Sequence, residues 1–137
     1  MKFFKDRFNK YTQARNLHNN KGAALMNIAI GFFSLSYITR HWLLLLIMGL
    51  SGLFSLLTGM YFFWKNRHLP IYKDKVGGIV HICLGFFVLF IFIFFGYFSP
   101  GKLLPPSIYF VILNVISILI LFYIGIVMLI SKHKKIN

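Results

Sequence analysis

Apolar residues fall into four long runs that are separated by short polar segments. The runs cover residues 22–39, 43–64, 76–98 and 107–131. At a rise of about 1.5 Å per residue, each run forms a helix of roughly 27 to 38 Å, and the hydrocarbon core of a bilayer is roughly 30 Å thick. The pattern therefore predicts an all-α integral membrane protein with four transmembrane helices.

Residues 22–39 form the shortest run, and Asn27 interrupts it. A cleaved signal peptide is the competing interpretation of this run. Its polar leader would be 21 residues long, the run lacks an A-x-A cleavage site, and three further apolar runs follow. We therefore interpret residues 22–39 as a membrane anchor.

The runs favour helices over the strands of a transmembrane barrel. Barrel strands alternate apolar and polar residues over about ten positions, whereas stretches such as WLLLLIMGL and FFVLFIFIFF are apolar on every face. In lipid, such a segment must satisfy its own backbone hydrogen bonds, and only a helix does so.

The composition also indicates lipid as the surrounding solvent. The chain is 58% hydrophobic and 19% aromatic, and Asp6 and Asp74 are its only acidic residues. Such a chain cannot form a soluble surface of mixed charge. We expect a tail of residues 1–21, followed by one four-helix transmembrane domain of residues 22–137.

Basic residues are distributed unevenly among the polar segments. Thirteen of the fifteen lie in the N-terminal tail, between the second and third runs, or after the fourth run. Arg40 and Lys102 occupy the other two connections. By the positive-inside rule, this asymmetry predicts a multi-pass cell-membrane protein with both termini in the cytoplasm.

The two halves of the chain resemble each other. Residues 21–35 match residues 75–89 at six positions, and Ser51, Leu53 and Gly59 recur 66 positions later. We interpret the halves as two tandem helical hairpins related by a pseudo-two-fold axis along the membrane normal. The alternative is that apolar helices of biased composition resemble each other by chance.

Two helical faces carry a polar residue between small ones, at a spacing of four. The two sets are Ala23, Asn27 and Gly31, and Gly77, His81 and Gly85. Small residues at this spacing let helices approach closely in lipid, where polar contacts also contribute. We hypothesise that Asn27 and His81 form a hydrogen-bonded pair where these faces meet. The alternative is that each bonds a backbone carbonyl or reaches toward the headgroups.

The tail mixes aromatic with basic residues. Phe4, Phe8 and Tyr11 fall on one helical stripe, which predicts an interfacial helix whose bases face anionic lipid headgroups on the cytoplasmic side. The candidate membrane-surface residues are Lys2, Lys5, Arg7, Lys10, Arg15 and Lys21. A solvated tail is the alternative, and nucleic-acid binding is not expected beside a membrane span.

Catalytic patterns are absent from the sequence. No apolar run contains a carboxylate, and we find no nucleophile beside a base, no phosphate-binding glycine loop and no ligand cluster with metal spacing. We expect no enzyme activity, metal or cofactor.

The remaining functions are those of a small membrane protein. We expect a non-catalytic protein that acts through helix–helix interaction, as an accessory, regulatory or immunity protein, with a membrane-protein partner or as a homo-oligomer. The alternative is a subunit of an oligomeric small-solute channel or transporter. The excess of Lys over Arg, 11 to 4, suggests a bacterial origin.

Overall fold

The computed structural model describes residues 1–37, 42–94 and 108–134, and it contains helices and no strands within those ranges. The helices are α1 (Lys2–Ala14), α2 (Lys21–Ser36), α3 (Trp42–Lys65), α4 (Lys75–Ile93) and α5 (Ile108–Ile130). The predicted all-α class is confirmed.

Helices α3, α4 and α5 are each long and apolar enough to cross a membrane. Large apolar side chains cover their outer surfaces, which suits contact with lipid rather than water. The length and composition of these helices suggest a membrane-spanning protein and are compatible with a multi-pass one. Parts of the predicted runs, at residues 38–39, 95–98 and 107, lie outside the described residues.

Helix α2 is shorter than the other three. It has 16 residues, or about 24 Å at the helical rise, compared with a hydrocarbon core of about 30 Å. The fourth predicted transmembrane helix is thus present as an apolar helix, but its length alone does not establish a membrane crossing.

Similar caps begin α2 and α4. The side chain of Asn20 accepts a hydrogen bond from the backbone N–H of Ala23 at 3.0 Å, and that of Asp74 accepts one from Gly77 at 2.9 Å. Each cap satisfies one of the free N–H groups in the first helical turn. The two caps are 54 positions apart, the same offset that relates residues 21–35 to 75–89.

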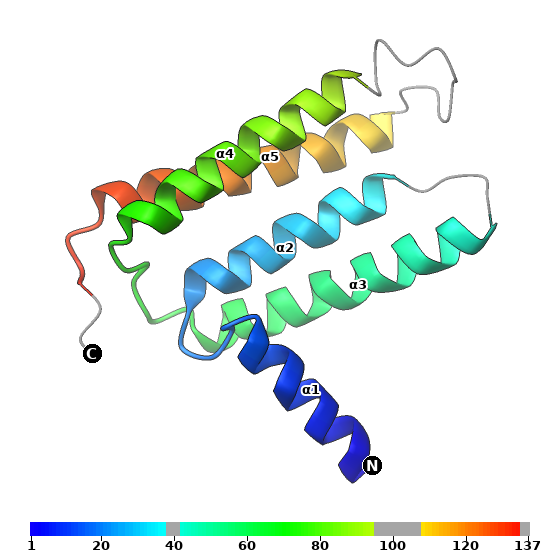
Figure 1. Cartoon of the computed structure of the whole chain (residues 1–137), viewed down its shortest axis with the longest axis horizontal. Helices are drawn as coiled ribbons and strands as arrows, with labels where there is room; N and C mark the ends of the chain where they lie inside the picture. The colour runs from blue at the N-terminus through cyan, green and yellow to red at the C-terminus, as the bar shows by residue number, and fades with distance from the viewer. Residues whose placement is uncertain (38–41, 95–107, 135–137) are drawn as a thin grey trace.

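The four apolar helices contact one another in the order α3–α2–α5–α4, and α4 crosses α5 in the view of Figure 1. We refer to these four helices as the layer. Helix α2 packs against α3 and α5, and α4 packs against α5. A two-fold axis that converts α2 to α4 and α3 to α5 would require α3 to contact α4 as α2 contacts α5. The main contacts among the described helices lack that pair. The contacts correspond instead to a shift along the layer that places the α2–α3 hairpin on the α4–α5 hairpin. The predicted two-fold pattern is therefore not observed.

The same close contact occurs in both hairpins. A Cβ atom added to Gly59 of α3 would lie 2.9 Å from the carbonyl oxygen of Ala24, and one added to Gly125 of α5 would lie 2.9 Å from that of Gly78. Real Cβ atoms essentially never come so close to another heavy atom. Each hairpin therefore depends on glycine at this crossing. Ala24 and Gly78 are 54 positions apart, and Gly59 and Gly125 are 66 positions apart, the offsets that relate the two halves of the sequence.

The predicted cytoplasmic segments gather at one end of the layer. The Nζ of Lys21 donates to the carbonyl oxygen of Arg67 at 3.4 Å, which joins the start of α2 to the end of α3. The backbone N–H of Lys73 donates to His133 at 2.7 Å, which joins the segment before α4 to the segment after α5. The described parts of the three basic segments thus lie together.

Candidate functional site

The most connected polar group inside the layer lies between α2 and α3. The Nδ2 of Asn27 donates to the carbonyl oxygen of Ser55 at 3.0 Å, and the Oγ of Ser55 donates to the carbonyl oxygen of Asn27 at 2.9 Å. Both side chains are buried. We refer to Asn27, Ser55 and the adjoining Tyr11 as the polar junction.

Tyr11 brings α1 to this junction. Its hydroxyl lies 3.4 Å from both amide atoms of Asn27, which is a long hydrogen bond with either one. Its ring packs against that of Phe54 with centroids 5.2 Å apart. The tail predicted from sequence therefore folds as a helix that contacts the apolar hairpin directly.

The linker between α1 and α2 fixes the position of α1. Leu17 is fully buried, and its carbonyl oxygen accepts a hydrogen bond from Nδ2 of Asn66 at 2.9 Å. Thr12 is also fully buried and donates to the carbonyl oxygen of Asn9. Its oxygen is then left to accept from Nε2 of His18, 2.9 Å away. These contacts make α1 part of the folded protein.

A single side-chain hydrogen bond is described between the two hairpins. The Oγ of Ser117 on α5 donates to the carbonyl oxygen of Ala29 on α2 at 2.9 Å, and both residues are fully buried. A Cβ atom added to Gly22 would lie 2.8 Å from Cε of Met128. The α2–α5 contact is thus close-packed, with a polar bond near its centre.

The predicted Asn27–His81 pair is not formed. Asn27 bonds Ser55 and Tyr11, whereas Nδ1 of His81 lies 2.6 Å from the carbonyl oxygen of Gly77 on its own helix. The pairing was expected to join α2 and α4, but α5 lies between these helices in the layer. The alternative interpretation, in which each residue bonds a backbone carbonyl, agrees with these contacts.

One ring nitrogen of His81 has no hydrogen-bond partner in the described part of the chain. Because a carbonyl oxygen can only accept, Nδ1 carries the proton in the bond to Gly77, and Nε2 is an acceptor in the neutral ring. Nε2 is buried, and among the described residues it has no partner. The same holds for Oδ1 of Asn114, whose Nδ2 donates to Phe110 at 2.9 Å.

Gly31 and Gly85 lie at helix contacts, although not at a contact with each other. A Cβ atom added to Gly31 would lie 2.7 Å from the backbone nitrogen of Leu56, and one added to Gly85 would lie 3.0 Å from the ring of Phe122. Each glycine therefore faces the second helix of its own hairpin. Leu56 and Phe122 are again 66 positions apart.

The candidate membrane-surface bases lie on or near α1. Lys2, Lys5, Arg7, Lys10 and Arg15 are exposed, and Lys21 is half-buried. Three of these six cations lie over aromatic rings, with the charged atom 5.2 to 5.7 Å from the ring centre. The pairs are Arg7 with Phe3, Arg15 with Tyr11, and Lys21 with Phe63.

No family model, curated protein or solved structure matches this chain. Function must therefore be inferred from the contacts of the chain itself. Within residues 1–37, 42–94 and 108–134, no three His, Cys, Asp or Glu side chains come together as a possible metal site. The described polar atoms inside the layer mainly join helices or bond their own helix.

The role of Ser55 was not predicted from sequence, although a signal for it was present. Ser55 lies three positions after Gly52 and four before Gly59, so the three residues share a face of α3. Small residues on one face indicate close helix packing in lipid. Asn27 faces this stripe of α3 and does not face His81. This choice of partner depends on the order of helices in the layer.

Proposed function

We propose that this protein crosses the cell membrane four times, with both termini in the cytoplasm. On this view it acts without catalysis, through helix–helix interaction, as an accessory, regulatory or immunity protein. Membrane helices associate through close packing and polar contacts, and the α2–α3 and α2–α5 contacts have both properties. The observation that carries the proposal is a face of α4 on which Val76, Val80 and Cys83 are exposed.

The position of α2 supports a fourth crossing. It lies between α3 and α5, and its first residue bonds the segment after α3. At its other end, the ring of Tyr37 packs against that of Phe110 near the start of α5, with centroids 5.3 Å apart. The contacts of α2 and the adjoining Tyr37 thus reach from Met128 to Phe110 of α5, so α2 would share the membrane depth of α5. An even number of crossings then leaves the basic segments on the cytoplasmic side.

Recurring contacts support a tandem repeat of two hairpins. The equivalent pairs are Gly59–Ala24 and Gly125–Gly78, and Gly31–Leu56 and Gly85–Phe122. Similar composition alone does not require the same contacts at the same offsets. The repeat we propose shifts one hairpin along the layer and needs no two-fold axis.

The repeat identifies a face of α4 that has no partner among the described helices. Helix α2 contacts α5 along a stripe that includes Gly22, Met26 and Ala29. The corresponding residues of α4 are Val76, Val80 and Cys83, and all three are exposed. We propose that a transmembrane helix of another protein packs on this α4 face, as α5 packs on α2.

A channel or transporter subunit is the alternative, and one observation favours it. Nε2 of His81 and Oδ1 of Asn114 are buried and have no hydrogen-bond partner within the described ranges, and water in a conduit would satisfy them. In that case the interior of an oligomer would admit water, whereas a packed interaction protein would exclude it.

Thiol labelling separates these functions. In a Cys83→Ser background, Ser117→Cys and Asn114→Cys should resist a membrane-impermeant thiol reagent if the helices are packed. Lys134→Cys, in the exposed C-terminal segment, should react only from the cytoplasmic side. Labelling of the two buried positions would support a conduit, and labelling of Lys134→Cys from outside would contradict the orientation.

Cross-linking tests the α4 face. A photoreactive residue in place of Val80 should give one discrete adduct in cells, whereas the same residue in place of Leu119 should give none. Val80 and Leu119 are comparably exposed, at 47% and 62%. The absence of an adduct at Val80, or the same adducts at both positions, would contradict a specific helix partner.

A further inference from the structure

Helix α1 carries a row of apolar side chains, Phe4 and Phe8, of which Phe8 contacts α3 and Phe4 is exposed. We call this row the ridge. The ring of Phe8 packs between Phe54 and Phe62, with centroids 6.4 and 6.3 Å away. One turn earlier, Phe4 is 76% exposed. Figure 1 shows α1 leaving the layer of helices at a steep angle. Because Phe4 is so exposed, lipid rather than protein would contact it.

Two adjoining hollows follow this ridge. One has a volume of about 590 Å³ and is lined by Met1, Lys2, Phe4, Lys5 and Phe8. The other has a volume of about 390 Å³ and is lined by Phe4, Arg7, Phe8, Tyr11 and Phe54. Because they share Phe4 and Phe8, they form an apolar track from the start of α1 to the middle of α3.

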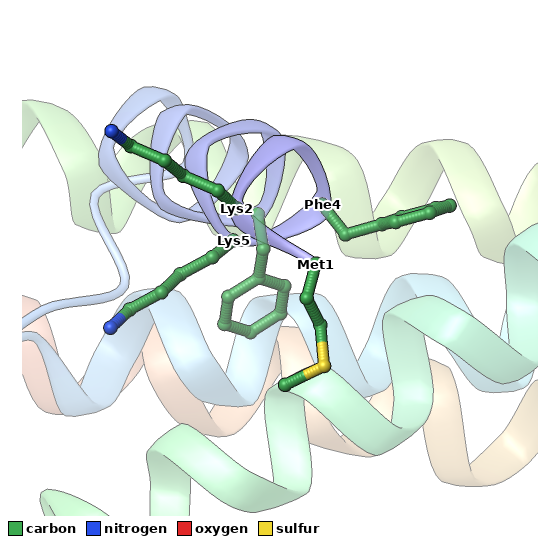
Figure 2. A pocket seen from close by; sticks show the side chains of 5 residues that line it. Met1, Lys2, Phe4 and Lys5 are labelled. Carbon is green, nitrogen blue, oxygen red and sulfur yellow. The ribbon is translucent and has the colours of Figure 1, made fainter.

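Charge is placed on one side of this track. Figure 2 shows the ammonium groups of Lys2 and Lys5 pointing away from the side of α1 on which Phe4 lies. The chain has two carboxylates for fifteen Lys and Arg residues, so most cations need a counter-charge from outside the chain. A ligand that matches this arrangement has an anionic group next to a long apolar segment.

We propose that the track binds one anionic phospholipid of the cytoplasmic leaflet. Its phosphate binds the ammonium groups of Lys2 and Lys5, and one acyl chain follows Phe8 to Phe54. This inference rests on the proposed membrane location. It differs from general attraction between a basic tail and a charged surface, because it assigns one lipid to a defined site.

The structure favours a lipid over a free anion for a physical reason. Free phosphate would contact the lysines and leave the hollows beside Phe4 and Phe54 unfilled. An acyl chain fills them and gains the hydrophobic contribution, which is proportional to the apolar area removed from water. Helices that bind membranes in this way place aromatic residues at the boundary of headgroups and acyl chains, with Lys and Arg on the polar face.

Fluorescence quenching tests the site. In a background with Trp42→Phe and Trp64→Phe, Phe54→Trp is the probe, and Phe90→Trp is the control on the exposed surface of α4. The protein is reconstituted with phosphatidylglycerol or phosphatidylcholine brominated on the acyl chains. If each lysine strengthens the binding of an anionic lipid about fivefold, the two lysines together predict a preference for phosphatidylglycerol on the order of twentyfold at Phe54→Trp. At Phe90→Trp, we expect nearly equal quenching by the two lipids.

Two charge variants separate a specific site from surface charge. K2Q/K5Q should reduce the preference at Phe54→Trp to about twofold or less, and K132Q/K134Q, which removes the same charge from the other terminal segment, should leave it unchanged. Native mass spectrometry of chains with both tryptophans present gives an independent readout: the wild-type chain should retain phosphatidylglycerol, and K2Q/K5Q should lose it.

Equal preference at the two probes, or equal loss in the two charge variants, would overturn the lipid site. Neither outcome affects thiol labelling of Ser117→Cys or cross-linking at Val80. A failure of the lipid site is therefore distinguishable from a failure of the proposed function.

Discussion

Asn27 and Ser55 exchange two hydrogen bonds across the α2–α3 contact, each side chain donating to the backbone carbonyl of the other residue. The side chains therefore satisfy backbone acceptors and do not bond each other. In lipid a buried polar side chain without a partner is costly, because water cannot replace the lost bond. This relationship makes the first hairpin sensitive to either residue.

We predict that Asn27→Ala and Ser55→Ala each lower the free energy of unfolding by about 1 kcal/mol, within the range for polar contacts in membranes. Since the two bonds have different donors and acceptors, the losses should be nearly additive. Unfolding by SDS in detergent micelles, followed by circular dichroism, measures both. Ser51→Ala is the control, because Ser51 is exposed and bonds only its own helix, at 3.5 Å. An effect of Ser51→Ala as large as the other two would contradict the prediction.

Gly59 provides a test of helix approach. A Cβ atom there would lie 2.8 Å from the backbone nitrogen of Ile28, so Gly59→Ala must push α2 and α3 apart. We expect a loss of about 1–3 kcal/mol, the range for overpacking. Gly49→Ala on the same helix meets no atom within 4 Å, and it should be neutral or slightly stabilising, since Ala is the better helix former. The same SDS titration compares them, and similar values would show that helix propensity, not contact, determines the result.

Asn66 should control access to the linker after α1. Asn66→Ala removes the donor to the buried carbonyl oxygen of Leu17, and such a loss costs about 1–3 kcal/mol. Local opening should then rise about fivefold or more, and trypsin should cleave faster after Arg15. His68→Ala, at an exposed position two residues away, is the control. Unchanged cleavage in Asn66→Ala would mean that other contacts alone hold the linker.

The all-helical class and the positions of the apolar helices could be predicted from sequence because lipid imposes strong local rules. A long apolar run must form a helix to satisfy its backbone, so the predicted run 43–64 corresponds to α3 at Trp42–Lys65. The order of the helices is not a local property. The small faces of α2 and α4 look alike in sequence, yet each packs within its own hairpin. The partner of Asn27 therefore depended on which helix lies beside α2, and spacing along the chain does not contain that information.

His81 gives the last prediction, because its position corresponds to Asn27 but its surroundings differ. The residue that corresponds to Ser55, 66 positions later, is Leu121, which offers no side-chain hydrogen bond, and Nε2 of His81 has no partner among the described residues. Replacing both partners of a buried polar contact by apolar groups can be nearly neutral, whereas an unpaired buried polar atom is costly. We therefore expect His81→Leu to change the free energy of unfolding by less than about 1 kcal/mol, or to increase it, while Asn27→Leu lowers it. SDS titration of both variants measures this difference. A clear loss in His81→Leu would mean that Nε2 bonds water or a solute in the membrane, which would favour the channel over the interaction protein.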